Sequence, residues 1–148
     1  MRQLETSVHI DATPDEVWRV LTDFDHYGEW NPFITSIEGP VEVGARLSVS
    51  LTPPRGRTIR MKPTVRVVQP GRRLRWLGHL GVPGIFDGEH EFVVEPVGPP
   101  DGPGARFTQR ETFRGAMVPF VRRILERTRT GFEAMNRALK ERVEAVAP

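Results

Sequence analysis

Cysteine is absent from all 148 residues, so disulfide bonds, thiolate metal sites and cysteine nucleophiles are excluded. Long apolar runs are absent too, because no stretch approaches the ~18 consecutive apolar residues of a membrane-spanning helix. The first ten residues lack the apolar core of a signal peptide. Together these absences predict a cytoplasmic protein without a transmembrane segment.

A large excess of charge of either sign is also missing. The 21 basic residues nearly balance the 19 acidic ones, which gives a formal net charge of +2. Nucleic-acid-binding domains usually carry a clear basic patch or stripe. The arginines near the C-terminus alternate with glutamates, a pattern typical of a solvated helix face. We therefore expect no nucleic-acid partner.

Most of the chain has the alternating pattern of β-strands, and its length suits a single domain, residues 1–148, with a sizeable core. The first strand is expected at residues 4–10, because every second residue there is suited to the interior. Residues 52–60 and 97–104 are rich in proline, glycine or arginine and are expected to be loops. Six further strands are predicted at residues 33–38, 46–51, 61–69 (bent at Pro63), 73–80, 85–95 and 105–113.

Helices are predicted at two places. After the first strand, Thr13 is a good N-cap, Pro14 suits the first helical position and Glu16 completes a capping box. A second short helix or turn follows at residues 23–30. From about Val118 the apolar period becomes 3.6, which predicts one long amphipathic helix of roughly seven turns. Its apolar stripe consists of Val121, Leu125, Thr128, Phe132, Met135, Leu139 and Val143.

Opposite charges indicate how the long strands pair. If residue numbers in the hairpin of residues 85–95 and 105–113 sum to 201, three opposite-charge pairs share one face: Glu95–Arg106, Glu91–Arg110 and Asp87–Arg114. A sum of 166 for the preceding hairpin places Arg75 opposite Glu91 and His79 opposite Asp87 on that same face. The charged face must then be solvated, and the opposite face must be covered by the long helix. This arrangement predicts an α+β protein.

The same registers predict what lies inside. His90 faces Glu111 on the inner face, among aromatic side chains. Gly78 faces Gly88, which leaves space and lets the sheet bend. Gly131 lies inside the long helix, where glycine costs roughly 1 kcal/mol relative to alanine. It provides either room for a ligand or close packing between helix and sheet.

Several motifs resemble the START/Bet v 1-like (SRPBCC) superfamily. Residues 11–18 read DATPDEVW and are followed by WNP at residues 30–32. Residues 84–90 (GIFDGEH), 109–115 (QRETFRG) and 131–136 (GFEAMN) are similar to its bacterial polyketide cyclase/dehydrase-like branch. The resemblance covers essentially the whole chain. It implies a helix-grip fold, in which a curved antiparallel sheet of about seven strands wraps around the long C-terminal helix.

The resemblance also implies a deep hydrophobic cavity between sheet and helix that binds a lipid, polyketide or other small apolar molecule. We expect a volume in the ~300–1,000 Å³ range of small-molecule sites. The predicted ligand-binding residues are Trp30, Phe33, Trp76, Phe86, His90, Phe92, Phe107, Gln109, Glu111, Phe113, Phe132 and Met135.

Three functions remain open from the sequence. The first is binding or carriage of a small hydrophobic ligand, with His90 and Glu111 as a buried pair that holds its polar tip. The second is a cofactor-independent polyketide cyclase or dehydratase, in which the same two catalytic residues share a proton and act as acid and base. The third is a protein-interaction module, as in a co-chaperone family of this fold, which would show an exposed apolar patch. We expect no cofactor and no metal, because the four histidines lack a metal-ligand spacing.

Overall fold

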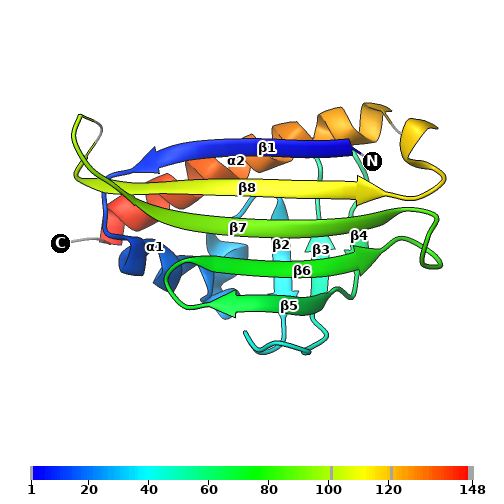
Figure 1. The fold of residues 1–148 in the computed structure, drawn as a ribbon, viewed down its shortest axis with the longest axis horizontal. Coiled ribbons are helices and arrows are strands. Elements are labelled where there is room, and N and C mark those ends of the chain that lie inside the picture. Colours follow the sequence, from blue (N-terminus) through cyan, green and yellow to red (C-terminus); the bar gives the residue numbers. More distant parts are fainter. Residues whose placement is uncertain (1, 101, 121, 147–148) are drawn as a thin grey trace.

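Two antiparallel sheets and one long helix make up the fold of this computed structural model, which describes residues 2–100, 102–120 and 122–146 (Figure 1). The larger sheet has the strand order β1-β8-β7-β6-β5, and the smaller has the order β2-β3-β4. The strands of the larger sheet are β1 (Arg2–Ile10), β5 (Thr64–Gln69), β6 (Arg73–His79), β7 (Asp87–Val97) and β8 (Gly104–Arg114). Those of the smaller sheet are β2 (Ile34–Glu38), β3 (Ser48–Leu51) and β4 (Ile59–Met61).

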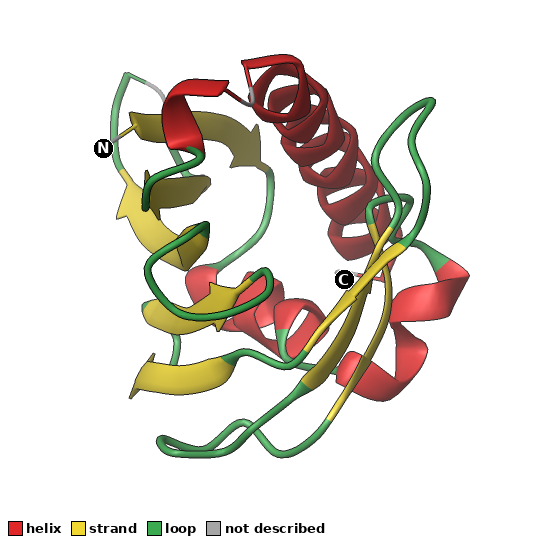
Figure 2. Cartoon of the chain, turned by 90° about the vertical axis from the view of Figure 1, so that its right-hand side faces the viewer, coloured by secondary structure: helices red, strands yellow, loops and turns green. Residues whose placement is uncertain are grey.

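The helices are α1 (Pro14–Leu21), the 3₁₀ helices η1 (Phe24–Glu29) and η2 (Val118–Phe120), and α2 (Arg122–Val146). Figure 2 shows α2 and the two sheets arranged around a shared interior. The long C-terminal helix and its inward stripe are confirmed, since Leu125, Phe132, Met135, Leu139 and Val143 are buried. Val121, the first residue of that predicted stripe, lies outside the described residues. This is the expected helix-grip fold.

The predicted start of α1 is confirmed. The backbone N–H of Glu16 donates to the Thr13 hydroxyl at 3.2 Å, as in a capping box. The reciprocal bond differs from the usual one, because the Glu16 carboxylate accepts from the Thr13 hydroxyl at 3.0 Å. Pro14 occupies the first helical turn, where its missing N–H costs nothing.

Both predicted hairpin registers are confirmed residue by residue. His90 pairs with Glu111 and Glu91 with Arg110 in the β7–β8 ladder, while Gly78 pairs with Gly88 in the β6–β7 ladder. Three of the five predicted charge pairs form ion pairs: Arg110–Glu91, Arg75–Glu91 and His79–Asp87. The charged face of the larger sheet is therefore the outer one. The side chains on the opposite face of β6, β7 and β8 point toward α2.

The strand count differs from the prediction. Eight strands in two sheets replace about seven strands in one, because residues 61–69 do not form a single strand. Pro63 separates β4 from β5, and its missing N–H cannot join a ladder. Strand β4 also begins at Ile59, inside the expected loop of residues 52–60. A bridge between Arg46 and Thr64 still links the two sheets at this corner.

Candidate functional site

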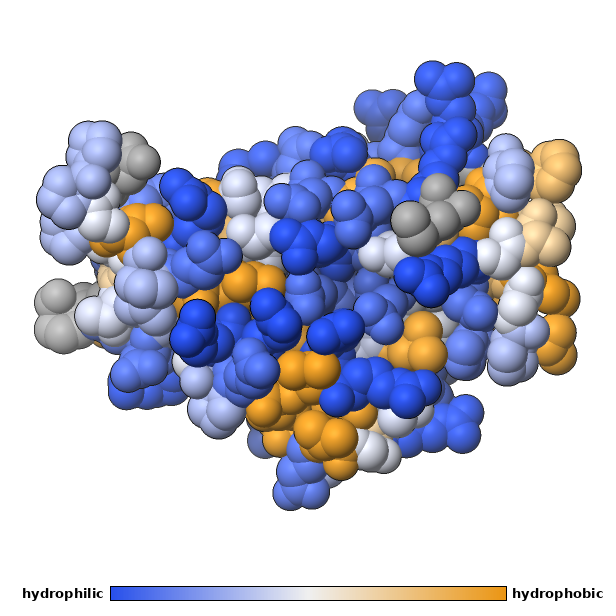
Figure 3. Space-filling view, in the orientation of Figure 1, coloured by the Kyte–Doolittle hydropathy of each residue, from blue (hydrophilic) through white to orange (hydrophobic). Residues whose placement is uncertain are grey.

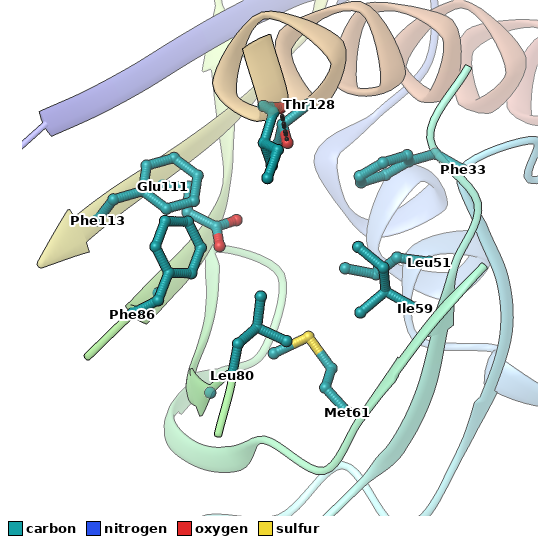
Figure 4. A pocket seen from close by; sticks show the side chains of 12 residues that line it. Phe33, Leu51, Ile59, Met61, Leu80, Phe86, Glu111, Phe113 and Thr128 are labelled. Carbon is teal, nitrogen blue, oxygen red and sulfur yellow. Dashed lines mark hydrogen bonds between the residues drawn. The ribbon is translucent and has the colours of Figure 1, made fainter. Parts of the chain in front are cut away.

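A small cavity lies where the two sheets and the first turns of α2 converge (Figure 4). Its volume is about 50 Å³. Its wall is apolar except for Thr128 and Glu111, and Glu111 is its single ionisable residue. Ile124 lies on the wall and is 44% exposed, so the cavity reaches the surface beside α2. The lining residues are Phe33, Leu51, Ile59, Met61, Gly78, Leu80, Phe86, Gly88, Glu111, Phe113, Ile124 and Thr128.

The expectation of a ~300–1,000 Å³ cavity is wrong for this structure. Side chains fill the space that the glycines leave. A Cβ on Gly78 would lie 2.1 Å from the terminal methyl of Met61, and one on Gly88 would lie 2.5 Å from Glu111 Oε1. A Cβ on Gly131 would lie 2.3 Å from Phe33, so this glycine serves close packing. The sequence showed the glycines but not which side chains would cover them.

The twelve predicted ligand-binding residues separate into two groups. Four lie on the cavity wall: Phe33, Phe86, Glu111 and Phe113. The others do not line the cavity, and all but the half-buried Trp30 are buried in the packed interior: Trp76, His90, Phe92, Phe107, Gln109, Phe132 and Met135. Trp30 packs edge-on against Tyr27, with ring centroids 5.1 Å apart. Contact between any of the twelve and a ligand stays a prediction.

Several wall residues are missing from the predicted set. Thr128 belongs to the predicted helical stripe, and Leu51 and Leu80 end two of the predicted strands, so the sequence does carry a signal for all three. Ile59 gave none, because it falls in a segment that looks like an exposed loop. Met61 lies in β4, on the other side of Pro63 from β5, and its terminal methyl covers Gly78, a contact that no sequence pattern indicates.

His90 and Glu111 form the expected pair. His90 Nδ1 lies 3.0 Å from Glu111 Oε2, as their opposite positions on β7 and β8 require. The His90 side chain is 4% exposed and that of Glu111 is 14% exposed. Figure 4 shows the Glu111 carboxylate directed into the cavity, beside the rings of Phe86 and Phe113 and opposite Phe33 and Ile59. The imidazole therefore lies behind the wall, and the carboxylate is the group that a bound molecule would meet.

A chain of buried polar groups continues from His90 toward α2 and β1. His90 Nε2 lies 3.0 Å from Gln109 Oε1. The Gln109 amide nitrogen donates to the Phe132 carbonyl at 3.2 Å and to Asn136 Oδ1 at 2.7 Å. The Asn136 amide in turn donates to the Thr6 hydroxyl at 3.0 Å. Every bond joins different elements, so the chain fixes the His90 ring relative to the sheet and the helix.

Phe33 owes its position to the turn that precedes it. The Asn31 side chain accepts hydrogen bonds from the backbone N–H groups of Phe33 and Ile34, both at 2.9 Å. Such a side-chain-to-backbone turn fixes the local backbone at the start of β2. The Phe33 ring then packs edge-on against Phe132, with centroids 5.6 Å apart. The asparagine of the WNP motif thus orients one wall of the cavity.

Exposed apolar side chains lie beside the cavity, on α2 and on the loops next to Phe86 and Phe113. We call Val82, Ile85, Met117, Phe120 and Ile124 the apolar rim; each is 42–76% exposed. The backbone N–H of Met117 donates to the Ile85 carbonyl at 3.0 Å and that of Ala116 donates to the Gly84 carbonyl at 3.1 Å, which holds the two loops together. Figure 3 shows orange side chains at the corresponding end of the molecule. The charged outer face that the strand pairing predicts does not extend to this end, because the apolar rim lies on loops, on η2 and on the first turn of α2.

Among the residues that the structure describes, no three His, Asp or Glu side chains gather as metal ligands would. No helix in the described ranges is both long and apolar enough to cross a membrane.

The chain belongs to the family described as polyketide cyclase / dehydrase and lipid transport, which it matches over residues 1–144. No curated protein sequence matches it. Among solved structures it is similar to a START superfamily protein from Mycobacterium smegmatis, at 17% identity and a TM-score of 0.75 over 98% of this chain and 99% of the other. The identity is low, so this likeness shows the fold alone.

Two further structures have the same fold. One is the di-domain ARO/CYC BexL of the BE-7585A biosynthetic pathway, with 18% identity and a TM-score of 0.70 over 95% of this chain and 47% of that one. The other is a Thalictrum norcoclaurine synthase point mutant in complex with a transition-state analogue, with 17% identity and a TM-score of 0.74 over 97% and 94%. These likenesses show that the fold is shared, while the family match over residues 1–144 confirms the family that the sequence motifs indicate.

Proposed function

We propose that the protein binds a small hydrophobic molecule in the cavity between the larger sheet and α2. The observation that carries this proposal is the cavity wall, which is apolar except for Thr128 and a single carboxylate, Glu111. A wall of this kind provides apolar contact area and one group that orients a ligand, as small-molecule sites typically do. The family description, which includes lipid transport, supports the same function.

The cavity of about 50 Å³ holds only a small group as it stands. A larger ligand therefore requires wall side chains to turn aside. Met61 and Phe86 are the best suited to this, because both are half-buried residues of the cavity wall. Met61 is also unbranched and flexible, which lowers the cost of a rotamer change.

The apolar rim bears on how a ligand arrives. Exposed apolar patches mark protein, membrane or ligand contacts. The rim borders the cavity mouth, since Ile124 belongs to both and Ile85 precedes the wall residue Phe86. This position favours a role in ligand access over a role as an independent protein-docking surface.

Native mass spectrometry of the protein purified from its own host tests the proposal. A co-purified small molecule whose mass is lost on denaturation is the expected result. Binding of an apolar dye such as 8-anilinonaphthalene-1-sulfonate to the native protein, and its displacement by the extracted molecule, would place that molecule in the cavity. Native protein that carries nothing and binds no dye or small aromatic probe contradicts the proposal.

A second candidate is a cofactor-independent cyclase or dehydratase. The 3.0 Å contact between His90 and Glu111 favours it, because such a pair can take and return a proton. In that case Glu111→Gln keeps the side-chain shape and removes the base, and turnover falls by about 10²–10⁴-fold. Product formation by wild type and Glu111→Gln, followed by mass spectrometry on polyketide substrates, separates the two candidates. A binding protein returns every substrate unchanged.

A further inference from the structure

One oxygen of the cavity carboxylate has no partner among the described residues. Glu111 Oε2 contacts His90 Nδ1 at 3.0 Å, and this is the one ion pair that Glu111 makes within the described chain. Oε1 lies over Gly88, on the cavity side, and takes part in no hydrogen bond of the described residues. Whether Oε1 accepts or donates depends on where the protons of the pair lie, and the buried amide chain determines that.

The Phe132 carbonyl fixes the orientation of the Gln109 amide. A backbone carbonyl only accepts, so the Gln109 atom 3.2 Å from it must be the amide nitrogen. Its second N–H is directed at Asn136 Oδ1, 2.7 Å away. Gln109 Oε1 therefore faces His90, and the His90 Nε2 at 3.0 Å must carry a hydrogen that donates to it.

This assignment requires a proton on His90 Nδ1 or on Glu111, in addition to the hydrogen on Nε2. A neutral imidazole with hydrogen on Nε2 has a bare, accepting Nδ1. An ionised Glu111 Oε2 also only accepts, and two acceptors 3.0 Å apart repel each other. One of the two atoms must therefore carry a proton. Three aromatic rings surround the imidazole, with centroids at 4.2 Å (Phe92), 4.8 Å (Phe132) and 5.4 Å (Trp76), and such rings stabilise a cation.

We infer that the His90–Glu111 pair holds one shared proton and presents Glu111 Oε1 to the cavity solely as a hydrogen-bond acceptor, so that the site takes a neutral ligand with a hydroxyl or phenol group. With the proton on the imidazole, Oε1 belongs to a carboxylate; with the proton on Oε2, Oε1 is a carbonyl oxygen. Both forms accept and neither donates. The pair has no net charge, so it gives an ammonium group no counter-ion and a bare ketone no donor. This inference rests on the proposed function, because it assumes that ligands occupy this cavity.

A pair of probes of equal size tests the inference: 4-methylphenol and p-xylene, which differ by hydroxyl against methyl. For each protein we take the ratio of the p-xylene dissociation constant to the 4-methylphenol dissociation constant. We expect this ratio to be about tenfold higher for the wild type than for Glu111→Leu. Glu111→Gln should keep the wild-type preference, since its amide nitrogen would donate to His90 Nδ1 and leave its oxygen toward the cavity. Titrations followed by protein NMR suit the weak affinities of such small probes. In the same samples, ¹⁵N spectra of the His90 ring should show hydrogen on Nε2.

The outcomes distinguish this inference from the proposed function. If both probes bind with a ratio that Glu111→Leu does not change, the hydroxyl preference is overturned while cavity binding stands. The same holds if 4-methylbenzaldehyde or 4-methylbenzylamine binds more tightly than the phenol. If no probe binds, the inference and the proposed function fall together. If Glu111→Leu does not fold, two other results would still overturn the inference. One is a loss of the phenol preference in Glu111→Gln, and the other is a His90 Nε2 without hydrogen in the wild-type spectra.

Discussion

The ring of Phe33 packs against the backbone of Gly131 so closely that a Cβ there would lie 2.3 Å from Phe33 Cδ1. We therefore expect Gly131→Ala to destabilise the protein, although alanine is the better helix former by about 1 kcal/mol. Overpacking a buried site costs about 1–3 kcal/mol, so the net loss should be about 1 kcal/mol. Urea unfolding measures it. Phe33→Leu combined with Gly131→Ala should cost less than the sum of the two single changes; a stabilised Gly131→Ala protein would contradict the contact.

Removing the Met61 side chain beyond Cβ should enlarge the cavity. Its terminal methyl occupies the space over Gly78, so Met61→Ala opens that space to a ligand. We expect affinity for a bicyclic probe such as 2-naphthol to rise at least severalfold, with a loss of stability below the ~2–5 kcal/mol of a fully buried site, because Met61 is half-buried. Calorimetry measures the affinity. Met117→Ala, in the exposed apolar rim, is the matched control, and an equal effect there would refute the assignment of Met61 to the wall.

Glu91 is the centre of the charge cluster on the outer face. Its carboxylate lies 2.7 Å from Arg110, 3.4 Å from Arg73 and 3.4 Å from Arg75, and its side chain is 12% exposed. Glu91→Gln leaves three arginines without their shared counter-charge, and we expect a loss of about 1–3 kcal/mol in the free energy of unfolding. Glu95→Gln is the control, because Glu95 occupies the same face and register without an ion pair in the described chain and should change stability by less than about 0.5 kcal/mol. Equal losses of stability in Glu91→Gln and Glu95→Gln would contradict a stabilising role for the charge cluster.

Asp87 should make the free energy of unfolding decrease as the pH falls. A hydrogen bond from His79 at 2.7 Å, together with the Gly84 N–H, lowers the pKa of Asp87 below its ordinary value. A lowered folded-state pKa contributes stability above the unfolded value of about 4, and that contribution is lost as the pH falls through the folded value. Asp87→Asn should thus cost up to about 1 kcal/mol at pH 7 and much less near pH 2. Urea unfolding at both pH values, with Asp25→Asn as control, measures this cost. A cost of Asp87→Asn that is larger near pH 2 than at pH 7 would contradict the prediction.

Strand register could be predicted from the sequence because the signal there is redundant. The alternation of apolar residues set the face of each strand, and opposite charges such as Glu91 and Arg110 then set which residues lie opposite each other. A slip by one residue would have placed those charges in the interior. The contact between His90 and Glu111 follows from register alone, which explains why this part of the candidate site was predictable.

The size and walls of the cavity could not be predicted in the same way. They depend on which rotamers fill the space above Gly78 and Gly88, and on the break at Pro63 that moves Met61 into the smaller sheet. No periodic pattern encodes such contacts between distant segments. The amide chain through Gln109 was equally hidden, because its role depends on a helix carbonyl that any residue at position 132 would supply.

The first strand of the sheet has its partners at the far end of the chain. Val8 pairs with Phe107, and Thr6 accepts a hydrogen bond from Asn136, which is 130 positions away. Such high contact order slows folding, because a long loop must close before these contacts are gained. During synthesis, β1 must remain without its neighbour until β8 has left the ribosome, and the interior stays open until α2 follows. The nascent chain thus exposes an unpaired strand edge for most of its synthesis, which makes this stage the one most prone to aggregation.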